Sequence, residues 1–126
     1  MTLAIAEKDF LRTVVEYAEL HGWMVHHVLE QAHHAKRIGP GFPDLVLAKR
    51  NRVVFAELKA EKGQLSAVQQ EWLAVLRTVR GARTFLWRPS DWPEIEKVLG
   101  EYHRPGVAGG QAPPRHVDPE LRRRSW

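Results

Sequence analysis

The sequence predicts one α/β domain whose elements run helix, strand, strand, strand, helix, strand, helix. Two observations support this order. Three segments repeat apolar residues every three or four positions, as one face of an amphipathic helix does, and four short runs of strand-forming residues stand between them. The chain has 126 residues, and domains commonly span about 100 to 200 residues, so we expect a single hydrophobic core.

The first helix is predicted from Glu7 to His21, and Gly22 follows where a glycine commonly ends a helix. The apolar residues that share one face of this segment are Phe10, Leu11, Val14, Val15 and Ala18. Residues 23–28 are rich in strand formers and predict the first strand. The polar stretch 30–41 contains a Gly-Pro-Gly breaker and predicts a mobile loop.

The next two strands are predicted to form a hairpin. Residues 44–48 and 53–59 are apolar runs, and the four residues between them are polar. A connection of this length places the turn at Arg50 and Asn51. The hairpin therefore has a defined register.

In that register Asp44 faces Glu57, and the period of two along a strand puts Lys59 on the same side of the sheet. Like charges opposed across a strand pair are destabilising without compensation. Either a cation lies between the two carboxylates, or this end of the sheet is solvated. Oxygen ligands of this kind favour Mg²⁺ or Mn²⁺.

The second helix is predicted to begin after Ser66, because Ser66 and Gln69 have the spacing of a capping box, and to end at Gly81. Its apolar face is predicted to comprise Val68, Trp72, Val75, Leu76 and Val79. Residues 83–87 predict the fourth strand. Asp91 is the predicted N-cap of the last helix. The buried face of that helix is predicted to comprise Ile95, Val98 and Leu99.

The net charge of +4 is concentrated at one end of the chain. Residues 103–126 contain five arginines against one aspartate and one glutamate, whereas the rest of the chain is nearly neutral. This segment contains several glycines and prolines and has no apolar periodicity, so we expect a domain over residues 1–102 and a flexible basic tail over 103–126. Such a tail can bind phosphates or simply keep a protein soluble, and both interpretations stay open.

Composition excludes several functional classes. The chain has no cysteine, which excludes disulfides, thiolate zinc sites and cysteine nucleophiles, so a metal would be held by oxygen or imidazole. No apolar run approaches the ~20 residues of a membrane-spanning helix, and the first apolar residues meet charged ones too early for a signal peptide. We therefore expect a soluble protein of the cytoplasm that has no membrane partner.

Several short motifs follow one another in order along the chain. Gly41-Phe42-Pro43-Asp44 is followed, after twelve residues, by Glu57-Leu58-Lys59, and the two together resemble the PD-(D/E)xK nuclease signature. Gly63-Gln64-Leu65-Ser66 and then Gln69 resemble the virus-type replication-repair nuclease (VRR-Nuc) branch of that superfamily, which is similar to Holliday-junction resolvases. The resemblance covers about residues 7–99.

This resemblance implies a restriction-endonuclease-like core, in which a mixed central sheet is flanked by helices, and a phosphodiesterase that depends on Mg²⁺ or Mn²⁺. It implies that Asp44 and Glu57 bind the metal together with the backbone carbonyl of Leu58. Lys59 matches the lysine that orients or activates water and stabilises charge on the phosphate. Gln69 matches a glutamine near the site, although a role limited to the capping box is equally compatible with its position.

The family also carries a glutamate early in its first helix that reaches the metal, and Glu7 is the best match. Glu16 and Glu19 are alternatives, although both are more typical of solvated helix positions. His26 and His27 are not expected to form a metal site, because adjacent side chains on a strand point to opposite faces.

The resemblance implies a DNA endonuclease that is specific for branched structures such as a Holliday junction or a flap, that acts in DNA repair in a bacterium or phage, and that forms a homodimer. Four residues of the polar loop either contact DNA phosphates or are simply solvated: His33, His34, Lys36 and Arg37. The main alternative is a DNA-binding module with a vestigial nuclease site. A restriction-type, sequence-specific endonuclease is a weaker alternative, because little chain is left to read a sequence.

Overall fold

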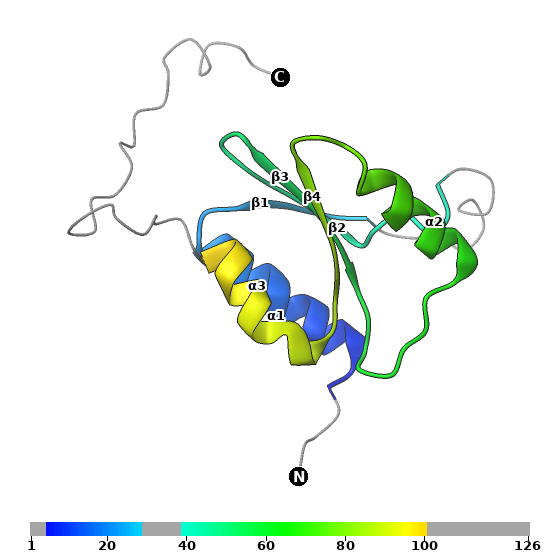
Figure 1. Ribbon diagram of the computed structural model, residues 1–126. Coiled ribbons are helices and arrows are strands. Elements are labelled where there is room, and N and C mark those ends of the chain that lie inside the picture. Colours follow the sequence, from blue (N-terminus) through cyan, green and yellow to red (C-terminus); the bar gives the residue numbers. More distant parts are fainter. Residues whose placement is uncertain (1–4, 29–38, 101–126) are drawn as a thin grey trace.

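The computed structural model describes residues 5–28 and 39–100 (Figure 1). The elements in chain order are α1 (Glu7–Leu20), β1 (Met24–His27), β2 (Leu45–Lys49), β3 (Arg52–Leu58), α2 (Ala67–Leu76), β4 (Ala82–Trp87), the 3₁₀ turn η1 (Pro89–Asp91), α3 (Trp92–Ile95) and the π-helical turn η2 (Glu96–Gly100). The predicted order of helices and strands is confirmed. The last predicted helix is built from three short turns of different pitch.

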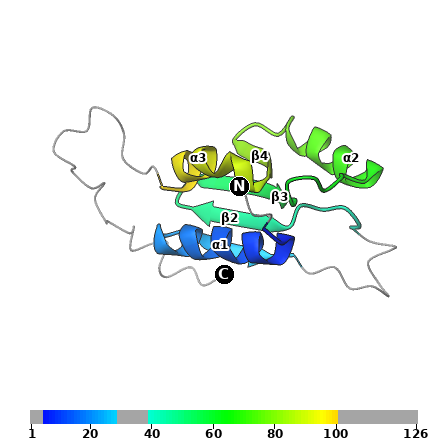
Figure 2. The ribbon, with the colours of Figure 1, turned by 90° about the horizontal axis from the view of Figure 1, so that it is seen from below.

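The four strands form one mixed sheet in the order β1-β2-β3-β4. Strand β2 pairs antiparallel with both β1 and β3, and β4 pairs parallel with β3. Figures 1 and 2 show α1 and α3 side by side on one face of the sheet and α2 on the other. This arrangement confirms the mixed α/β fold, and it places the helix that follows β3 on a different face from the other two helices.

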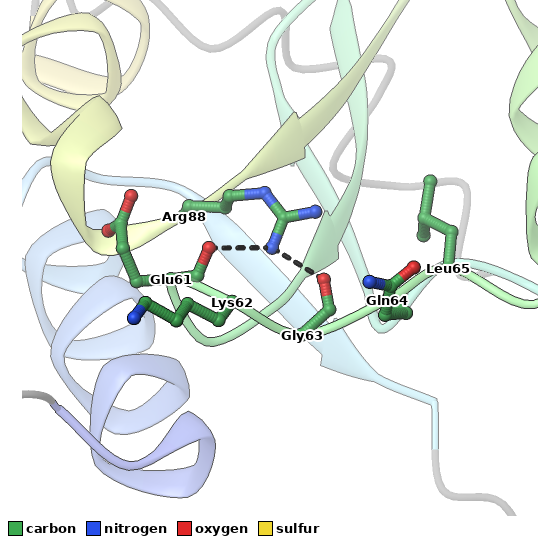
Figure 3. A pocket seen from close by; sticks show the side chains of 6 residues that line it. All are labelled: Glu61, Lys62, Gly63, Gln64, Leu65 and Arg88. Atoms are coloured by element: carbon green, nitrogen blue, oxygen red, sulfur yellow. Dashed lines mark hydrogen bonds between the residues drawn. The ribbon is translucent and has the colours of Figure 1, made fainter.

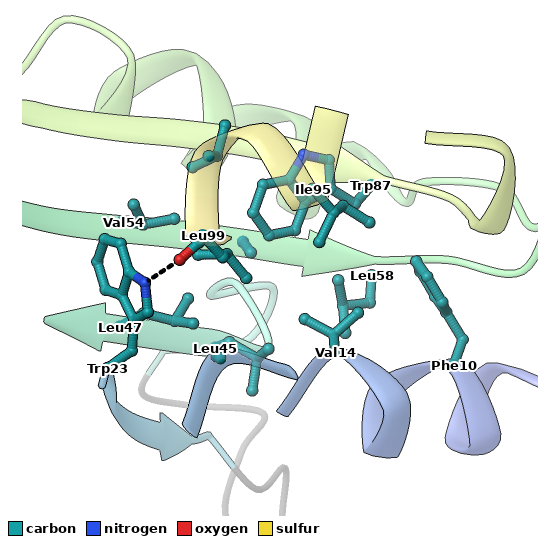
Figure 4. Packing of buried hydrophobic residues seen from close by; sticks show 13 residues of the cluster. Phe10, Val14, Trp23, Leu45, Leu47, Val54, Leu58, Trp87, Ile95 and Leu99 are labelled. Carbon is teal, nitrogen blue, oxygen red and sulfur yellow. Dashed lines mark hydrogen bonds between the residues drawn. The ribbon is translucent and has the colours of Figure 1, made fainter. Parts of the chain in front are cut away.

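The main core lies between the sheet and the pair of helices α1 and α3 (Figure 4). Its buried residues include Phe10, Val14, Trp23, Leu45, Leu47, Val54, Ala56, Leu58, Trp87, Ile95 and Leu99. Trp23 precedes β1, and its indole Nε1 donates to the carbonyl of Leu99 at 2.8 Å, so the buried ring has a partner for its polar atom. Because Ala56 and Leu58 face this core, the alternation along β3 turns Glu57 to the opposite face.

The hairpin register agrees with the one predicted. Leu45 pairs with Ala56 and Lys49 with Arg52, which leaves a two-residue turn, and Arg50 adopts a positive φ of 54° there. Asp44 directly precedes the first of these pairs. Asp44 and Glu57 are therefore the next residues beyond the last β2–β3 pair, one on each side.

Helix α2 differs from its prediction in length and in orientation. It ends at Leu76, and the fully buried residue is Leu73, whereas Val75 and Val79 are 60% and 46% exposed. The predicted apolar face was therefore wrong at Val75 and Val79. Val79 lies beyond the end of the helix, and the side of α2 that carries Trp72 is held by a hydrogen bond from Trp72 Nε1 to the carbonyl of Pro40 at 3.0 Å.

The two predicted helix caps differ in outcome. The capping box of α2 is confirmed: Ser66 Oγ accepts from Gln69 N at 3.2 Å, and Gln69 Oε1 accepts from Ser66 N at 2.8 Å. Asp91 stands before α3 but does not cap it with its side chain. Its carboxylate instead accepts from the backbone N–H of Arg88 at 2.8 Å, because the 3₁₀ turn η1 precedes α3.

Some predicted features lie outside the described residues. These are the loop residues His33, His34, Lys36 and Arg37 and the tail 103–126. Within residues 5–28 and 39–100, no helix is long and apolar enough to cross a membrane.

Candidate active site

The candidate site lies where β2 begins and β3 ends. The carboxylate of Asp44 accepts a hydrogen bond from the backbone N–H of Leu58 through Oδ2 at 2.8 Å. The carbonyl of Asp44 accepts from Val28 N, also at 2.8 Å, just beyond β1. Asp44 thus bonds to β3 through its side chain and to the residue after β1 through its backbone carbonyl. These two bonds hold its carboxylate beside β3.

Glu57 is the only charged residue in the buried set of the described chain, with 1% of its surface exposed. Its Oε2 accepts from Gln69 Nε2 at 3.0 Å and lies 4.0 Å from the Lys59 ammonium. Its Oε1 is buried and has no hydrogen-bond partner within the described residues. A buried polar atom without a partner is costly, so this oxygen is available to a ligand.

The electrostatics of the two carboxylates reflect their burial and their proximity. The pKa of Glu57 is raised to about 8, first by burial and then by the charge of Asp44, while the charge of Lys59 opposes the rise. Burial also raises the pKa of Asp44, whereas the hydrogen bond from Leu58 lowers it. The expected convergence of Asp44, Glu57 and Lys59 is therefore present. The end of the sheet at Glu57 is dry, which removes the solvated alternative for that carboxylate.

Glu7 begins α1, and its side chain is exposed. Its charge raises the pKa of both Asp44 and Glu57, so it lies on the same side of the molecule as the pair. Even so, no group of three or more Asp, Glu or His side chains in the described chain is arranged to hold a metal ion. Glu16 and Glu19 lie further along α1 and are exposed.

Gln69 fills both roles that its sequence position allowed. One end of its amide closes the capping box with Ser66, and the other end donates to Glu57. Leu58 contributes its N–H to Asp44, and its side chain is buried in the main core. His27 is exposed at the end of β1, where its charge lowers the pKa of Asp44.

The segment before Asp44 is held against α2 by contacts that the sequence analysis did not identify. A Cβ atom on Gly41, whose φ is +86°, would lie 2.7 Å from Val68 Cγ1 and 3.0 Å from Gln69 N. Phe42 packs edge-on against Trp72, with ring centroids 4.9 Å apart. The only signal in the sequence was the place of Gly41 directly before the Phe-Pro-Asp motif, and it does not specify which helix the glycine approaches.

The residues present fit a divalent cation. Two carboxylates lie together, and one buried oxygen lacks a partner among the residues that the structure describes. Oxygen donors of this kind suit Mg²⁺ and Mn²⁺. A cation would also offset the repulsion that raises the pKa of Glu57.

Comparison with known proteins decides the family. The VRR-NUC domain family matches residues 12–87, a span that includes Asp44, Glu57, Lys59 and Gln69 but not Glu7. The chain belongs to the VRR-NUC domain family. The resemblance seen in the sequence motifs is thereby confirmed, and this VRR-NUC domain is a nuclease domain by family.

Two solved structures share the fold of this VRR-NUC domain. One, described as a VRR_NUC domain, is 24% identical with a TM-score of 0.57, and the match covers 79% of this chain and 100% of that chain. The other, described as a VRR_NUC domain protein, is 16% identical with a TM-score of 0.56, covering 78% and 85% of the two chains. No curated protein matches the chain.

Proposed function

We propose that this VRR-NUC domain is a DNA endonuclease that depends on Mg²⁺ or Mn²⁺ and hydrolyses phosphodiester bonds at the Asp44–Glu57 pair. The observation that carries the proposal is the buried Oε1 of Glu57, which has no partner in the described chain and belongs to a carboxylate crowded by Asp44. A buried carboxylate of this kind is costly for folding alone. Its cost is explained if the site binds a cation.

In this proposal Asp44 and Glu57 hold the cation through their carboxylates, with the carbonyl of Leu58 as a further ligand. Gln69 occupies Oε2 of Glu57 and so orients the carboxylate with Oε1 available. Outer hydrogen bonds of this kind commonly orient metal ligands. Glu7 stays a proposed additional ligand, and it would have to move or act through water, because it does not join the pair in a three-residue group within the described chain. When bound, the cation would acidify a water molecule and neutralise phosphate oxygens.

Lys59 is proposed to act on the substrate directly. Its ammonium lies 4.0 Å from Glu57 Oε2, and its side chain is 14% exposed, so it can face the reacting phosphate without being fully solvated. A fixed positive charge at that place stabilises the negative charge that develops during hydrolysis. The same ammonium also favours the ionised form of Glu57, since it lowers the pKa of that carboxyl.

For the substrate we propose branched DNA, a Holliday junction or a flap, cleaved by a homodimer in the cytoplasm of a bacterium or of a phage-infected host. The support is the resemblance to Holliday-junction resolvases in the ordered motifs. Two symmetric active sites in a dimer would suit a two-fold junction. His33, His34, Lys36 and Arg37 are proposed DNA contacts.

A cleavage assay tests the proposal. The purified chain and its Lys59→Ala variant are incubated with labelled linear, flap, splayed and four-way DNA in Mg²⁺, Mn²⁺ or EDTA. We expect metal-dependent cleavage by the wild type, with flap or four-way DNA cut faster than linear DNA, and a large loss in the variant. Binding without cleavage under either metal would instead support a DNA-binding module with a vestigial site.

A further inference from the structure

A hollow of about 460 Å³, open to solvent, lies along the loop that follows Lys59 (Figure 3). Its lining residues are Glu61, Lys62, Gly63, Gln64, Leu65 and Arg88, and we call it the loop hollow. Five of these residues belong to the connection between Lys59 and the cap of α2, and Arg88 directly follows β4. The hollow therefore sits where the parallel strands β3 and β4 end.

The wall of the loop hollow touches the side chain of Lys59. A Cβ atom on Gly63 would lie 3.4 Å from Lys59 Cδ and 3.4 Å from the carbonyl oxygen of Ala60. The backbone N–H of Lys59 is bonded to the carbonyl of Trp87 at 3.0 Å, which ties this corner to β4. A ligand in the hollow would thus be a near neighbour of a phosphate at Lys59.

Arg88 fixes the loop with one terminal nitrogen only. Its Nη1 donates to the carbonyls of Ala60, Glu61 and Gly63 at 2.7, 3.1 and 2.7 Å. Its Nε and Nη2 make no hydrogen bond to any described residue. Figure 3 shows that the dashed bonds to Glu61 and Gly63 leave from one terminal nitrogen, and that the second points to the side on which Gln64 and Leu65 lie. The guanidinium therefore retains donors for a ligand.

The charges around the loop hollow favour an anion. Glu61 is engaged elsewhere, because its two carboxylate oxygens accept from the N–H and Oγ of Ser90 at 2.9 and 2.6 Å. Neither Lys62 nor Arg88 forms a salt bridge with a carboxylate among the described residues. The lining thus carries two positive charges, on Lys62 and Arg88, against one negative charge on Glu61. The side-chain amide of Gln64 adds a further hydrogen-bond donor.

We propose that the loop hollow binds a backbone phosphate of the DNA strand that is cut, next to the phosphate at Lys59, through Gln64 and the remaining nitrogens of Arg88. Lys62, whose exposed side chain extends to the Glu61 side in Figure 3, would turn to join them. This inference rests on the proposed function, and it specifies how the substrate strand is held. Contacts to phosphate fix the position of a protein on DNA and carry no sequence information. The loop hollow is accordingly a positioning site for the strand, and it works without the metal.

The test compares Lys62→Gln with Lys97→Gln. Both variants remove one exposed lysine, but Lys97 lies in η2, outside the loop hollow. Binding of a fluorescein-labelled DNA duplex is followed by anisotropy in EDTA over a series of NaCl concentrations. For duplex DNA the log–log salt slope changes by about 0.9 for each phosphate that the protein no longer neutralises. We expect Lys62→Gln to reduce the slope by that amount and Lys97→Gln to leave it unchanged.

Arg88→Lys provides a second measurement. An ammonium has three donors and can retain the bonds to the loop carbonyls, but it has no second nitrogen for the phosphate. We expect weaker DNA binding with little change in melting temperature. If Arg88→Lys unfolds the chain, the comparison of Lys62→Gln with Lys97→Gln tests the proposal by itself.

Equal slopes for the wild type, Lys62→Gln and Lys97→Gln would overturn the proposal, as would a wild type that binds no DNA in EDTA. The cleavage assay separates the two claims. If the wild type cuts DNA with Mg²⁺ while Lys62→Gln has the same salt slope as Lys97→Gln, the phosphate site in the loop hollow is wrong and the nuclease proposal stands. If the slope falls but nothing is cut, the hollow stands as a DNA contact and the nuclease proposal fails.

Discussion

Gln69 Nε2 donates a 3.0 Å hydrogen bond to Oε2 of the buried Glu57, and this bond connects α2 to the centre of the candidate site. The opposite end of the same amide accepts from Ser66 N at 2.8 Å. Only one orientation of the amide satisfies both bonds, because a carboxylate accepts and a backbone N–H donates. The first turn of α2 and the carboxylate of Glu57 are therefore fixed to each other.

This coupling predicts the effect of Gln69→Glu. A carboxylate at this position can still accept from Ser66, so the capping box survives, but it meets Glu57 with a second negative charge. We expect cleavage to fall about 10- to 100-fold, as is typical when the partner of a metal ligand is removed. Gln70→Glu is the control, because Gln70 is the exposed neighbour in the same helical turn. Equal cleavage rates for both variants would show that Gln69 serves α2 alone.

Lys59→Ala is expected to reduce kcat by about 10²- to 10³-fold, the range for loss of one fixed group that stabilises developing charge. KM should change little, because the loss falls on the transition state. Single-turnover cleavage with saturating protein measures the chemical step. Lys97→Ala, which removes an exposed lysine from η2, controls for the loss of one positive charge. A variant at position 59 with the wild-type rate would remove Lys59 from the mechanism.

The pH dependence of stability follows from the raised pKa of Glu57. Its pKa is about 8 in the folded chain against an ordinary value of 4.5, so between these values the folded state holds a proton that the unfolded state has lost. Linkage then requires the free energy of unfolding in EDTA to fall as pH rises through this window. Asp44 shifts in the same direction and adds to the trend. Urea unfolding at a series of pH values measures the slope.

Glu57→Gln is the control for this titration, because an amide keeps the acceptor for Gln69 and has no proton to lose in the window. We expect a flatter profile for the variant. A decline with pH as steep as in the wild type would assign the titration to another group.

Gly41 and Gly39 form a matched pair for the contact between the Phe-Pro-Asp segment and α2. Both have a positive φ, but a Cβ on Gly39 would meet no atom of the described residues within 4 Å, whereas a Cβ on Gly41 would collide with Val68 and the backbone of Gln69. Gly39→Ala should therefore cost only the strain of the left-handed conformation, about 1–2 kcal/mol. Gly41→Ala should cost more and also slow cleavage, because it pushes the segment that carries Asp44 away from α2. Equal melting temperatures and equal rates for the two variants would contradict this role.

Local patterns were sufficient to predict the hairpin register and the cap of α2. A two-residue turn and the alternation of the strands fix the register within about fifteen residues of chain. Asp44 and Glu57 could therefore be brought together from the sequence. Ser66 and Gln69 likewise lie within one helical turn of each other.

The features that the sequence did not predict depend on distant contacts. The rotation of α2 is set by Trp72 reaching Pro40, 32 residues earlier, and by Gln69 reaching Glu57. The clamp of Arg88 on the loop spans 25 to 28 residues. Apolar periodicity carries no information about such polar contacts or about where a helix ends, so it placed Val75 and Val79 on the buried face, whereas Val75 is exposed on α2 and Val79 lies beyond the end of α2 at Leu76.

The central claim, that Asp44 and Glu57 share one cation, is tested most directly by melting temperatures of the wild type and Asp44→Asn with and without Mn²⁺. Mn²⁺ should raise the melting temperature of the wild type, since a ligand that binds only the folded state stabilises it by RT ln(1 + [L]/Kd). Asp44→Asn should raise the melting temperature without metal, because an amide oxygen can keep the bond from Leu58 while its repulsion with Glu57 disappears, and it should reduce the Mn²⁺ shift. A variant that is less stable without metal and keeps the full Mn²⁺ shift would contradict the shared site.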